Sequence, residues 1–379
     1  MRPFVSTLIG AWSLPLCLAG LAGLSLLASC SRQEAPAQRT LNIYNWSDYI
    51  GEDTVANFEK ETGIKVHYDT FDSNEALHAK LVAGHSGYDI VVPSSNWAAI
   101  QTKGQLLQKI DHSRIANWSN IDPFVLQTTA RIDPGNQYLA PWLWGVATVG
   151  INVDKVKAAL GDLPMPKNGW DLLFKPEYAS RIQSCGFSLL DSGDEVFPAA
   201  LNYLGLPAES SNPADYAKAA TLLSKIRPYV TLFSSSGYIN ELVSGALCVS
   251  FGWNGDLGLA ARRAREAGNG QNIQTLIPKE GVMLFFDSMA IPADAEHVEE
   301  AYAWINYIYR PDVQAGIVNK VPYANPVRAA DRYIRPDLLA DKAVFIPEDQ
   351  RASLIPPEPL DSDSRRLRTR LYTRFKVGQ

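Results

Sequence analysis

Hydrophobic and polar residues alternate in blocks along the chain, and the first blocks predict a sheet covered by helices. Apolar and polar positions alternate over 41–44 and 64–68, as in half-buried strands, and 89–92 is a short apolar strand. Between them, 54–61 and 75–82 carry apolar residues at helical spacing. This β-α-β-α-β order is typical of a mostly parallel sheet with helices on its faces.

The pattern breaks around 134–152, and a second block of the same kind follows. The periodicity predicts strands over 187–190, 231–233, 247–251 and 283–291, and helices over 196–204, 216–226, 238–243, 260–267 and 298–309. We therefore expect an α/β fold with two lobes, and the cleft between the lobes is the expected ligand site.

The N-terminus carries the pattern of an export signal. Arg2 is positive, 8–27 is largely apolar, and the run Leu27-Ala28-Ser29-Cys30 matches a lipobox. We expect 1–29 to be a lipoprotein signal peptide, 30–39 to be a polar tether, and Cys30 to carry the lipid. The protein would then be periplasmic and attached to a bacterial membrane through that lipid only. A plain cleaved signal peptide and an uncleaved anchor helix are the alternatives.

Composition changes this picture little. The chain has 379 residues, a net charge of −5 and 46% hydrophobic residues, which is ordinary for a globular protein of two domains and argues against nucleic acid as a partner. The C-terminus is locally basic, and apolar residues are interleaved with its arginines. This interleaving predicts an amphipathic helix whose basic face is solvated, with Arg365, Arg366, Arg368, Arg370, Arg374, Leu367, Leu371 and Phe375.

The chain has four cysteines. Cys17 lies in the predicted signal and Cys30 is the predicted lipid site, which leaves Cys185 and Cys248. Two remaining cysteines in an exported protein indicate one disulfide, which would close a loop of 63 residues (248 − 185). Two buried free thiols are the alternative.

Motifs of catalysis and metal binding are absent from the sequence. It has no G-x-S-x-G, H-E-x-x-H, C-x-x-C, P-loop or G-x-G-x-x-G run, and none of its five histidines pairs at metal-ligand spacing. We expect no enzyme activity, no cofactor and no metal. A hydrolase that uses Ser94 or Ser235 is the enzymatic alternative, but no histidine is positioned as its base.

Polar and aromatic clusters follow the predicted strands, at 46–49, 94–95, 191–195, 234–236 and 253–256. Each alone has the composition of a turn. Together they lie where open α/β sheets bind ligands, in the loops at the carboxyl ends of strands.

The chemistry of these clusters is carboxylates beside aromatic rings. Asp48 lies between Trp46 and Tyr49, Asp256 follows Trp253, and Asp287 follows Phe285 and Phe286. Carboxylates accept charge-assisted hydrogen bonds from ammonium groups, and aromatic faces attract cations and pack against methylenes. The pattern therefore favours an alkyl cation as the ligand.

Several of these runs resemble the periplasmic polyamine-binding proteins of ABC transporters. The resemblance extends from about Leu41 to the basic C-terminal segment and is carried by 41–50 (LNIYNWSDYI), 58–66, 89–94, 238–240, 252–256 and 285–287. Ser47-Asp48 together with Phe285 is similar to the putrescine-binding members of the family.

The resemblance implies a type II periplasmic binding protein fold. One lobe would comprise 40–142 plus 286–330 and the other 143–285 plus 331–379, with crossovers near Leu143, Phe285 and residue 330. It implies capture of putrescine or a similar diamine by lobe closure, and delivery to ABC transporter permease subunits. We expect a monomer. The paired cysteines of the family fall on Cys185 and Cys248.

The resemblance also implies roles for individual residues. Asp48 and Asp287 would hold one ammonium group, and Glu195 and Asp256 the other region, assisted by Ser235. The methylenes would be lined by Trp46, Trp253 and Phe285, with Tyr49 and Tyr323 at the edges and with further hydrogen bonds from Ser47 and Ser94.

Two runs depart from the family pattern, 95–97 (SNW) and 144–146 (WGV), and both bear on chain-length preference. A spermidine-preferring binder is therefore kept as an alternative. A polyamine receptor for a signalling system on the same fold is another, because the sequence does not separate it from a transport component. A binder of another ligand, such as an anion or an amino acid, is a further alternative, and the acid-rich slot disfavours anions.

Overall fold

The computed structural model describes residues 38–379. The predicted signal peptide 1–29, Cys30 and most of the tether 30–39 lie outside the described residues.

The first sheet is three-stranded and parallel, in the order β2-β1-β3. It consists of β1 (Thr40–Trp46), β2 (Lys65–Phe71) and β3 (Ile90–Val91), connected by α1 (Thr54–Thr62) and α2 (Asn74–Val82). The predicted β-α-β-α-β order is thus confirmed.

The second sheet is seven-stranded, in the order β10-β9-β4-β7-β5-β6, with β8 paired to β4. Its strands are β4 (Ala140–Asn152), β5 (Phe187–Leu189), β6 (Leu232–Phe233), β7 (Val249–Trp253), β8 (Ile273–Leu276), β9 (Val282–Met289) and β10 (Leu354–Ile355). β5 is parallel to β6 and β7, whereas β4 is antiparallel to β7, β8 and β9. This sheet is therefore mixed.

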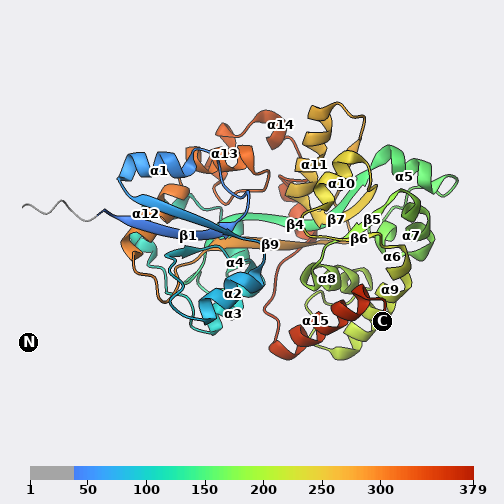
Figure 1. Ribbon diagram of the computed structural model, residues 1–379, viewed down its shortest axis with the longest axis horizontal. Helices are drawn as coiled ribbons and strands as arrows, with labels where there is room; N and C mark the ends of the chain where they lie inside the picture. The colour runs from blue at the N-terminus through green and yellow to red at the C-terminus, as the bar shows by residue number, and fades with distance from the viewer. Residues whose placement is uncertain (1–37) are drawn as a thin grey trace, which may run out of the picture. The chain divides into compact units, whose positions relative to one another are not determined.

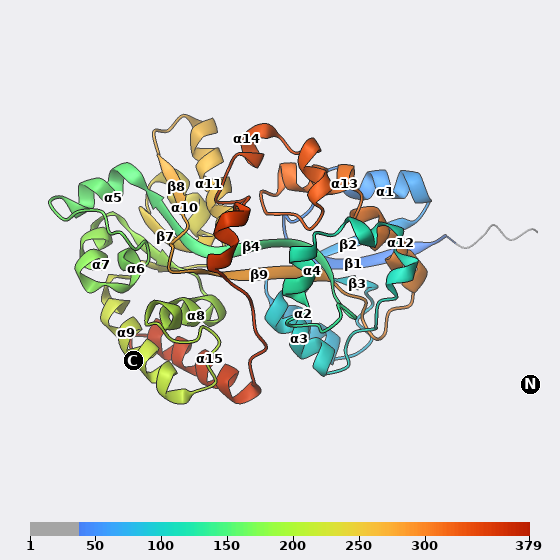
Figure 2. The same cartoon turned by 180° about the vertical axis from the view of Figure 1, so that it is seen from behind.

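Helices surround both sheets. α1, α2, α3 (Ser95–Lys103), α12 (Val298–Ile308) and α13 (Pro311–Lys320) gather around the first sheet (Figures 1 and 2). The helices around the far part of the second sheet are α5 (Val153–Leu160), α6 (Asp171–Phe174), α7 (Pro176–Ile182), α8 (Gly193–Tyr203), α9 (Pro213–Ile226), α10 (Tyr238–Ser244), α11 (Asn254–Ala267) and α15 (Ser362–Lys376). Two short helices complete the fold, α4 (Pro123–Thr129) and α14 (Pro336–Leu339).

The longest strand, β4, lies where the sequence pattern indicated a break. All 13 of its residues are buried. A strand covered on both faces has no polar alternation, so its period is invisible in the sequence.

β4 and β9 run across the middle of the molecule, between the two groups of helices (Figures 1 and 2). Leu143 pairs with Asp287 and Gly145 with Phe285. Near its end β9 also forms an isolated antiparallel β-bridge to the segment after β3, in which Ser94 pairs with Asp287. Asp287 therefore lies where the two parts of the fold meet. The lobe boundaries given above stay a prediction.

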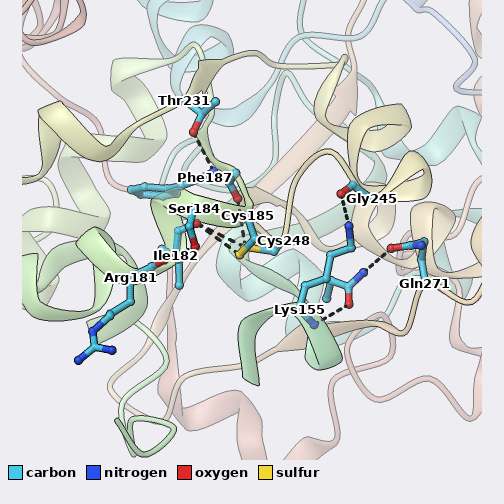
Figure 3. The surroundings of a disulfide bond; sticks show 12 residues. Lys155, Arg181, Ile182, Ser184, Cys185, Phe187, Thr231, Gly245, Cys248 and Gln271 are labelled. Atoms are coloured by element: carbon cyan, nitrogen blue, oxygen red, sulfur yellow. Dashed lines mark hydrogen bonds between the residues drawn. A yellow bond between two sulfur atoms is a disulfide. The ribbon is translucent and has the colours of Figure 1, made fainter. Parts of the chain in front are cut away.

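The predicted disulfide is confirmed. Cys185 and Cys248 are bonded, with Cα atoms 5.5 Å apart, just before β5 and β7 (Figure 3). A bridge across a loop of this length stabilises a fold by roughly 4 kcal/mol.

The C-terminal helix is present as α15, but its basic face is not wholly solvated. Phe375 is buried, as the amphipathic pattern requires, and Arg370 is exposed. Arg368, however, is only 1% exposed. The expectation of a solvated basic face is wrong at this position, because α15 packs against α8 and α9. Within residues 38–379, none of the helices has the length and apolar character needed to cross a membrane.

Candidate ligand-binding site

Asp287 is a buried carboxylate held by two hydroxyl groups. The Tyr49 hydroxyl donates to its Oδ2 at 2.8 Å, and the Ser94 hydroxyl donates to its Oδ1 at 2.6 Å. Burial raises the pKa of Asp287 to about 6, and the two hydrogen bonds oppose that rise. Across residues 38–379 no basic side chain forms an ion pair with it. The site thus holds an oriented acid whose charge is not cancelled.

Asp256 repeats this arrangement in the first turn of α11. The Tyr323 hydroxyl donates to its Oδ1 at 2.7 Å and the Tyr238 hydroxyl to its Oδ2 at 2.8 Å. Burial raises the pKa of Asp256. It too has no ion-pair partner in the described part of the chain.

The segment 253–256 is a helix start rather than the predicted loop. α11 begins at Asn254 instead of 260, and the buried Asn254 side chain explains the early start. Its Oδ1 accepts from the Val146 N–H at 3.0 Å, and its Nδ2 donates to the Ala343 carbonyl at 2.7 Å. These bonds fix the first turn, which carries Asp256, against β4.

Two glycines make room for the tyrosines that hold Asp256. A Cβ added at Gly255 would lie 2.5 Å from the Tyr323 ring, and one added at Gly252 would lie 2.5 Å from the Tyr238 ring. Contacts this short are not tolerated between heavy atoms. Glycine at both positions is therefore a steric requirement of the site.

Aromatic rings connect the two acids. Tyr323 packs edge-to-face against Tyr49, with centroids 5.6 Å apart, and against Phe285, with centroids 5.8 Å apart. Asp256 also contributes to raising the pKa of Tyr49, after burial and Asp287. The carboxylates of Asp256 and Asp287 thus belong to one cluster, lined by aromatic rings.

The two predicted tryptophans are half-buried and anchored by polar atoms. The Trp46 indole Nε1 donates to the Val92 carbonyl at 2.9 Å. The backbone N–H of Trp253 donates to the Tyr238 hydroxyl at 3.1 Å. Both residues therefore have a defined position at the ends of β1 and β7.

Glu195 lies in the first turn of α8, and one of its oxygens has no partner. Oε2 is buried and forms no hydrogen bond within residues 38–379. Burial, and then the charge of Asp194, raise the pKa of Glu195 to about 7. Glu195 in turn contributes to raising the pKa of Tyr238, so it lies on the Asp256 side of the cluster. A buried oxygen without a donor costs free energy unless a ligand supplies one.

Three predicted site residues form no hydrogen bond with the side chains of this cluster. Asp48 is exposed, in a left-handed conformation with φ 55°. Ser47 is exposed, and its hydroxyl donates to Asp72 at 3.2 Å. Ser235 is half-buried, and its side chain makes no hydrogen bond to residues 38–379. Their binding roles stay a prediction.

Tyr238 is the residue that sequence reasoning missed. It belongs to the run 238–240 that resembles the family, but the resemblance implies no role for the tyrosine. It is fully buried, and its hydroxyl joins Trp253 to Asp256. A buried tyrosine usually needs a partner for its hydroxyl, which is the only sequence signal that pointed to such a role.

Two open hollows lie elsewhere on the surface. One, of about 640 Å³, adjoins the disulfide and is lined in part by Lys155 and Gly245 (Figure 3). The other, of about 700 Å³, is lined in part by Glu52, Arg310 and Lys320. Their charged groups are engaged, since Lys155 donates to the Gly245 carbonyl and Lys320 pairs with Glu52. The unpaired acids, rather than these hollows, define the candidate site.

The fold and the site define a class of protein. The chain belongs to the bacterial extracellular solute-binding protein family, which matches residues 53–343. Proteins of this family, and the relatives described next, bind solutes and are not enzymes, as the sequence predicted.

The relatives are polyamine-binding proteins by name. The chain is 47% identical to the putrescine-binding periplasmic protein PotF of Escherichia coli (strain K12), covering 96% of this chain and 98% of that one. It is 41% identical to the putrescine/agmatine-binding protein of Pseudomonas aeruginosa, covering 96% and 99%. It is 36% identical to the spermidine/putrescine-binding periplasmic protein of Escherichia coli (strain K12), covering 88% and 90%.

Solved structures confirm the fold. The spermidine/putrescine ABC transporter substrate-binding protein PotD of Streptococcus pneumoniae matches with a TM-score of 0.76 at 28% identity, covering 90% of this chain and 99% of that one. A putative spermidine/putrescine ABC transporter from Listeria monocytogenes matches with a TM-score of 0.78 at 30% identity, covering 90% and 100%. The predicted two-lobe type II periplasmic binding protein fold is therefore confirmed.

Proposed function

We propose that this protein is the extracytoplasmic polyamine-binding component of an ABC import system, and that it captures putrescine or a similar diamine. One observation carries the proposal. Asp256 and Asp287 are held by two hydroxyl groups each, lie in one aromatic cluster, and have no basic partner among residues 38–379. The names of the relatives support the same ligand class.

In this proposal each carboxylate binds an ammonium group. Hydroxyl donors orient Asp256 and Asp287, and no basic side chain within residues 38–379 pairs with either, so each carboxylate in its ionised form can pair with the ligand. Phe285, Tyr49 and Tyr323 cover the methylenes between the two charges. Closure of the lobes excludes water, and the lower dielectric strengthens both ion pairs.

The second ammonium has a further acid available. The unpartnered Oε2 of Glu195 lies on the Asp256 side and can accept from it. Asp48, which sequence resemblance assigns to the Asp287 end, would approach from the solvent side. The acids outnumber the two charges of a diamine, so we expect protons to occupy part of the empty site and to leave on binding.

Calorimetric titration with putrescine, cadaverine, agmatine and spermidine tests the proposal. We expect saturable binding of one diamine per chain, with putrescine bound more tightly than spermidine. Tighter binding of spermidine would replace the putrescine assignment with the spermidine-preferring alternative. The absence of binding to all four compounds would overturn the proposal.

We further propose that the mature protein is a monomer held at the membrane by a lipid on Cys30, and that it delivers its ligand to permease subunits. The lipobox sequence and the periplasmic location named for the relatives support this placement. Mass spectrometry of the N-terminal peptide from the membrane fraction tests it. We expect a lipid-modified Cys30 at the new N-terminus, and Cys30→Ser should release the protein from the membrane. An unmodified N-terminus at another residue would contradict the anchor.

A further inference from the structure

The C-terminal helix places a buried cation behind the candidate site. Arg368 of α15 is 1% exposed and lies 2.7 Å from Asp194 Oδ1 and 2.8 Å from Glu209 Oε2. Asp194 precedes Glu195 in the first turn of α8. The guanidinium thus pairs with the sequence neighbour of Glu195, the acid that the proposed function assigns to the ligand.

The charges around Arg368 are unbalanced. Asp194, Glu195 and Glu209 lie near two arginines of α15. Arg368 forms ion pairs with Asp194 and Glu209, and the charge of Arg365 also acts on both. Glu209 is largely buried; burial raises its pKa, whereas Arg368 and a hydrogen bond from Asn96 lower it. A buried carboxylate without a compensating charge tends to take up a proton. Within residues 38–379 Arg368 is the arginine that pairs directly with these acids, so their ionisation depends chiefly on its side chain.

We propose that Arg368 is a positioning residue of the ligand site, which holds the first turn of α8 and favours the charged form of Glu195 for the cationic end of the ligand. This inference rests on the proposed function. The arginine does not touch the ligand. It acts through Asp194 and through its own electric field at Glu195.

The groups that face Glu195 determine how its ionisation responds to substitution. The charge of Asp194 raises the pKa of Glu195, after burial, and the charge of Arg368 lowers it. Loss of the arginine should therefore shift ionisation of Glu195 to higher pH, and loss of the Asp194 charge should shift it to lower pH. The charged and titratable groups that face it are Asp194, Glu209, Arg368, Tyr238 and Tyr372.

The test is calorimetric titration of the full-length protein with putrescine at pH 6.5, 7.5 and 8.5. For Arg368→Met we expect affinity at pH 6.5 to fall by up to about tenfold, the factor that corresponds to one pKa unit. At pH 8.5 Glu195 is ionised in both proteins, and affinity should be within about threefold of the wild type. Asp194→Asn, which keeps the Arg368–Glu209 pair but removes the ion pair to the first turn of α8, should lower affinity at all three pH values while its pH profile shifts in the opposite direction, to lower pH.

Arg370→Met, on the exposed face of the same helix, is the matched control and should follow the wild-type pH profile. Arg368→Lys keeps the charge and should restore much of the profile. Circular dichroism confirms that each variant is folded, and Asp194→Asn provides the test if Arg368→Met is not. A loss of affinity for Arg368→Met that is equal at all three pH values would overturn the inference, as would an unshifted Asp194→Asn profile. If the wild type binds no polyamine, it is the proposed function that fails.

Discussion

The Tyr238 hydroxyl donates to Asp256 Oδ2 at 2.8 Å while it accepts from the Trp253 backbone N–H at 3.1 Å. One phenol thus ties a site carboxylate to the end of β7, and the position of Asp256 is set before any ligand arrives. Such preorganisation reduces the entropy that binding must remove.

Tyr238→Phe removes only this hydroxyl. We expect putrescine affinity to fall by about tenfold or more, because a hydrogen bond to a charged group contributes about 1.5–3 kcal/mol. Calorimetry measures the change. Tyr309→Phe is the matched control, since the Tyr309 hydroxyl is buried but has no hydrogen-bond partner within residues 38–379. Equal affinities for the two variants would show that the Tyr238 hydroxyl does not position Asp256.

Asp287→Asn separates binding from stability. We expect at least about a thirtyfold loss of putrescine affinity, because truncating one partner of a buried charge pair costs about 2–5 kcal/mol. The ligand-free protein should be as stable as the wild type or more so, because the buried carboxylate has a raised pKa and no cationic partner.

Titration calorimetry and thermal unfolding without ligand measure these two effects. Asp349→Asn changes an exposed acid and should alter neither. A ligand-free Asp287→Asn protein that unfolds well below the wild type would contradict the assignment of Asp287 to binding rather than to the fold.

The pH dependence follows from raised pKa values of about 6 for Asp287 and about 7 for Glu195. The ligand-free folded state keeps protons on these groups at pH values where the unfolded chain, with pKa values near 4, has lost them. Their contribution to stability is therefore complete below about pH 4 and is lost as pH rises through about 6 to 7. Putrescine needs the ionised forms, so its affinity should fall as pH drops from 8 to 5.5.

Thermal unfolding with and without putrescine across this pH range tests both predictions, the one on ligand-free stability and the one on putrescine affinity. The shift of the midpoint caused by the ligand should grow as pH rises from 5.5 to 8. Titrations in buffers of different ionisation enthalpy should reveal proton release on binding near pH 6. Proton uptake, or a shift of the midpoint that shrinks with rising pH, would contradict the assignment of these acids.

Gly255→Ala tests the packing of Tyr323 on the first turn of α11. The added Cβ would lie 2.5 Å from the ring, so the ring must move and its bond to Asp256 must lengthen. We expect about a tenfold loss of putrescine affinity, the effect of losing a hydrogen bond to a charged group. Gly258→Ala in the same helix meets no atom closer than 3.5 Å and should bind normally. Similar affinity for both variants would mean that the ring position is unimportant.

Much of the fold and half of the site could be predicted from residue order alone. Half-buried strands alternate and amphipathic helices have a period, so the first sheet was predicted correctly. Asp256 and Asp287 were identified because acids beside aromatic residues form a local pattern. β4 was not predicted, because a strand buried on both faces has no alternation of polar and apolar residues.

The sequence by itself determined the alternation of strands and helices, the cysteine pair, and the acids and aromatic residues available for a cationic ligand. Only the tertiary structure decided which of them meet. Tyr238 reaches Asp256 because α10 packs against α11, and Arg368 reaches Asp194 because α15 packs on α8, across 174 residues (368 − 194). Packing of distant segments turned an arginine of an apparently solvated face into a buried cation, and no local periodicity encodes that contact.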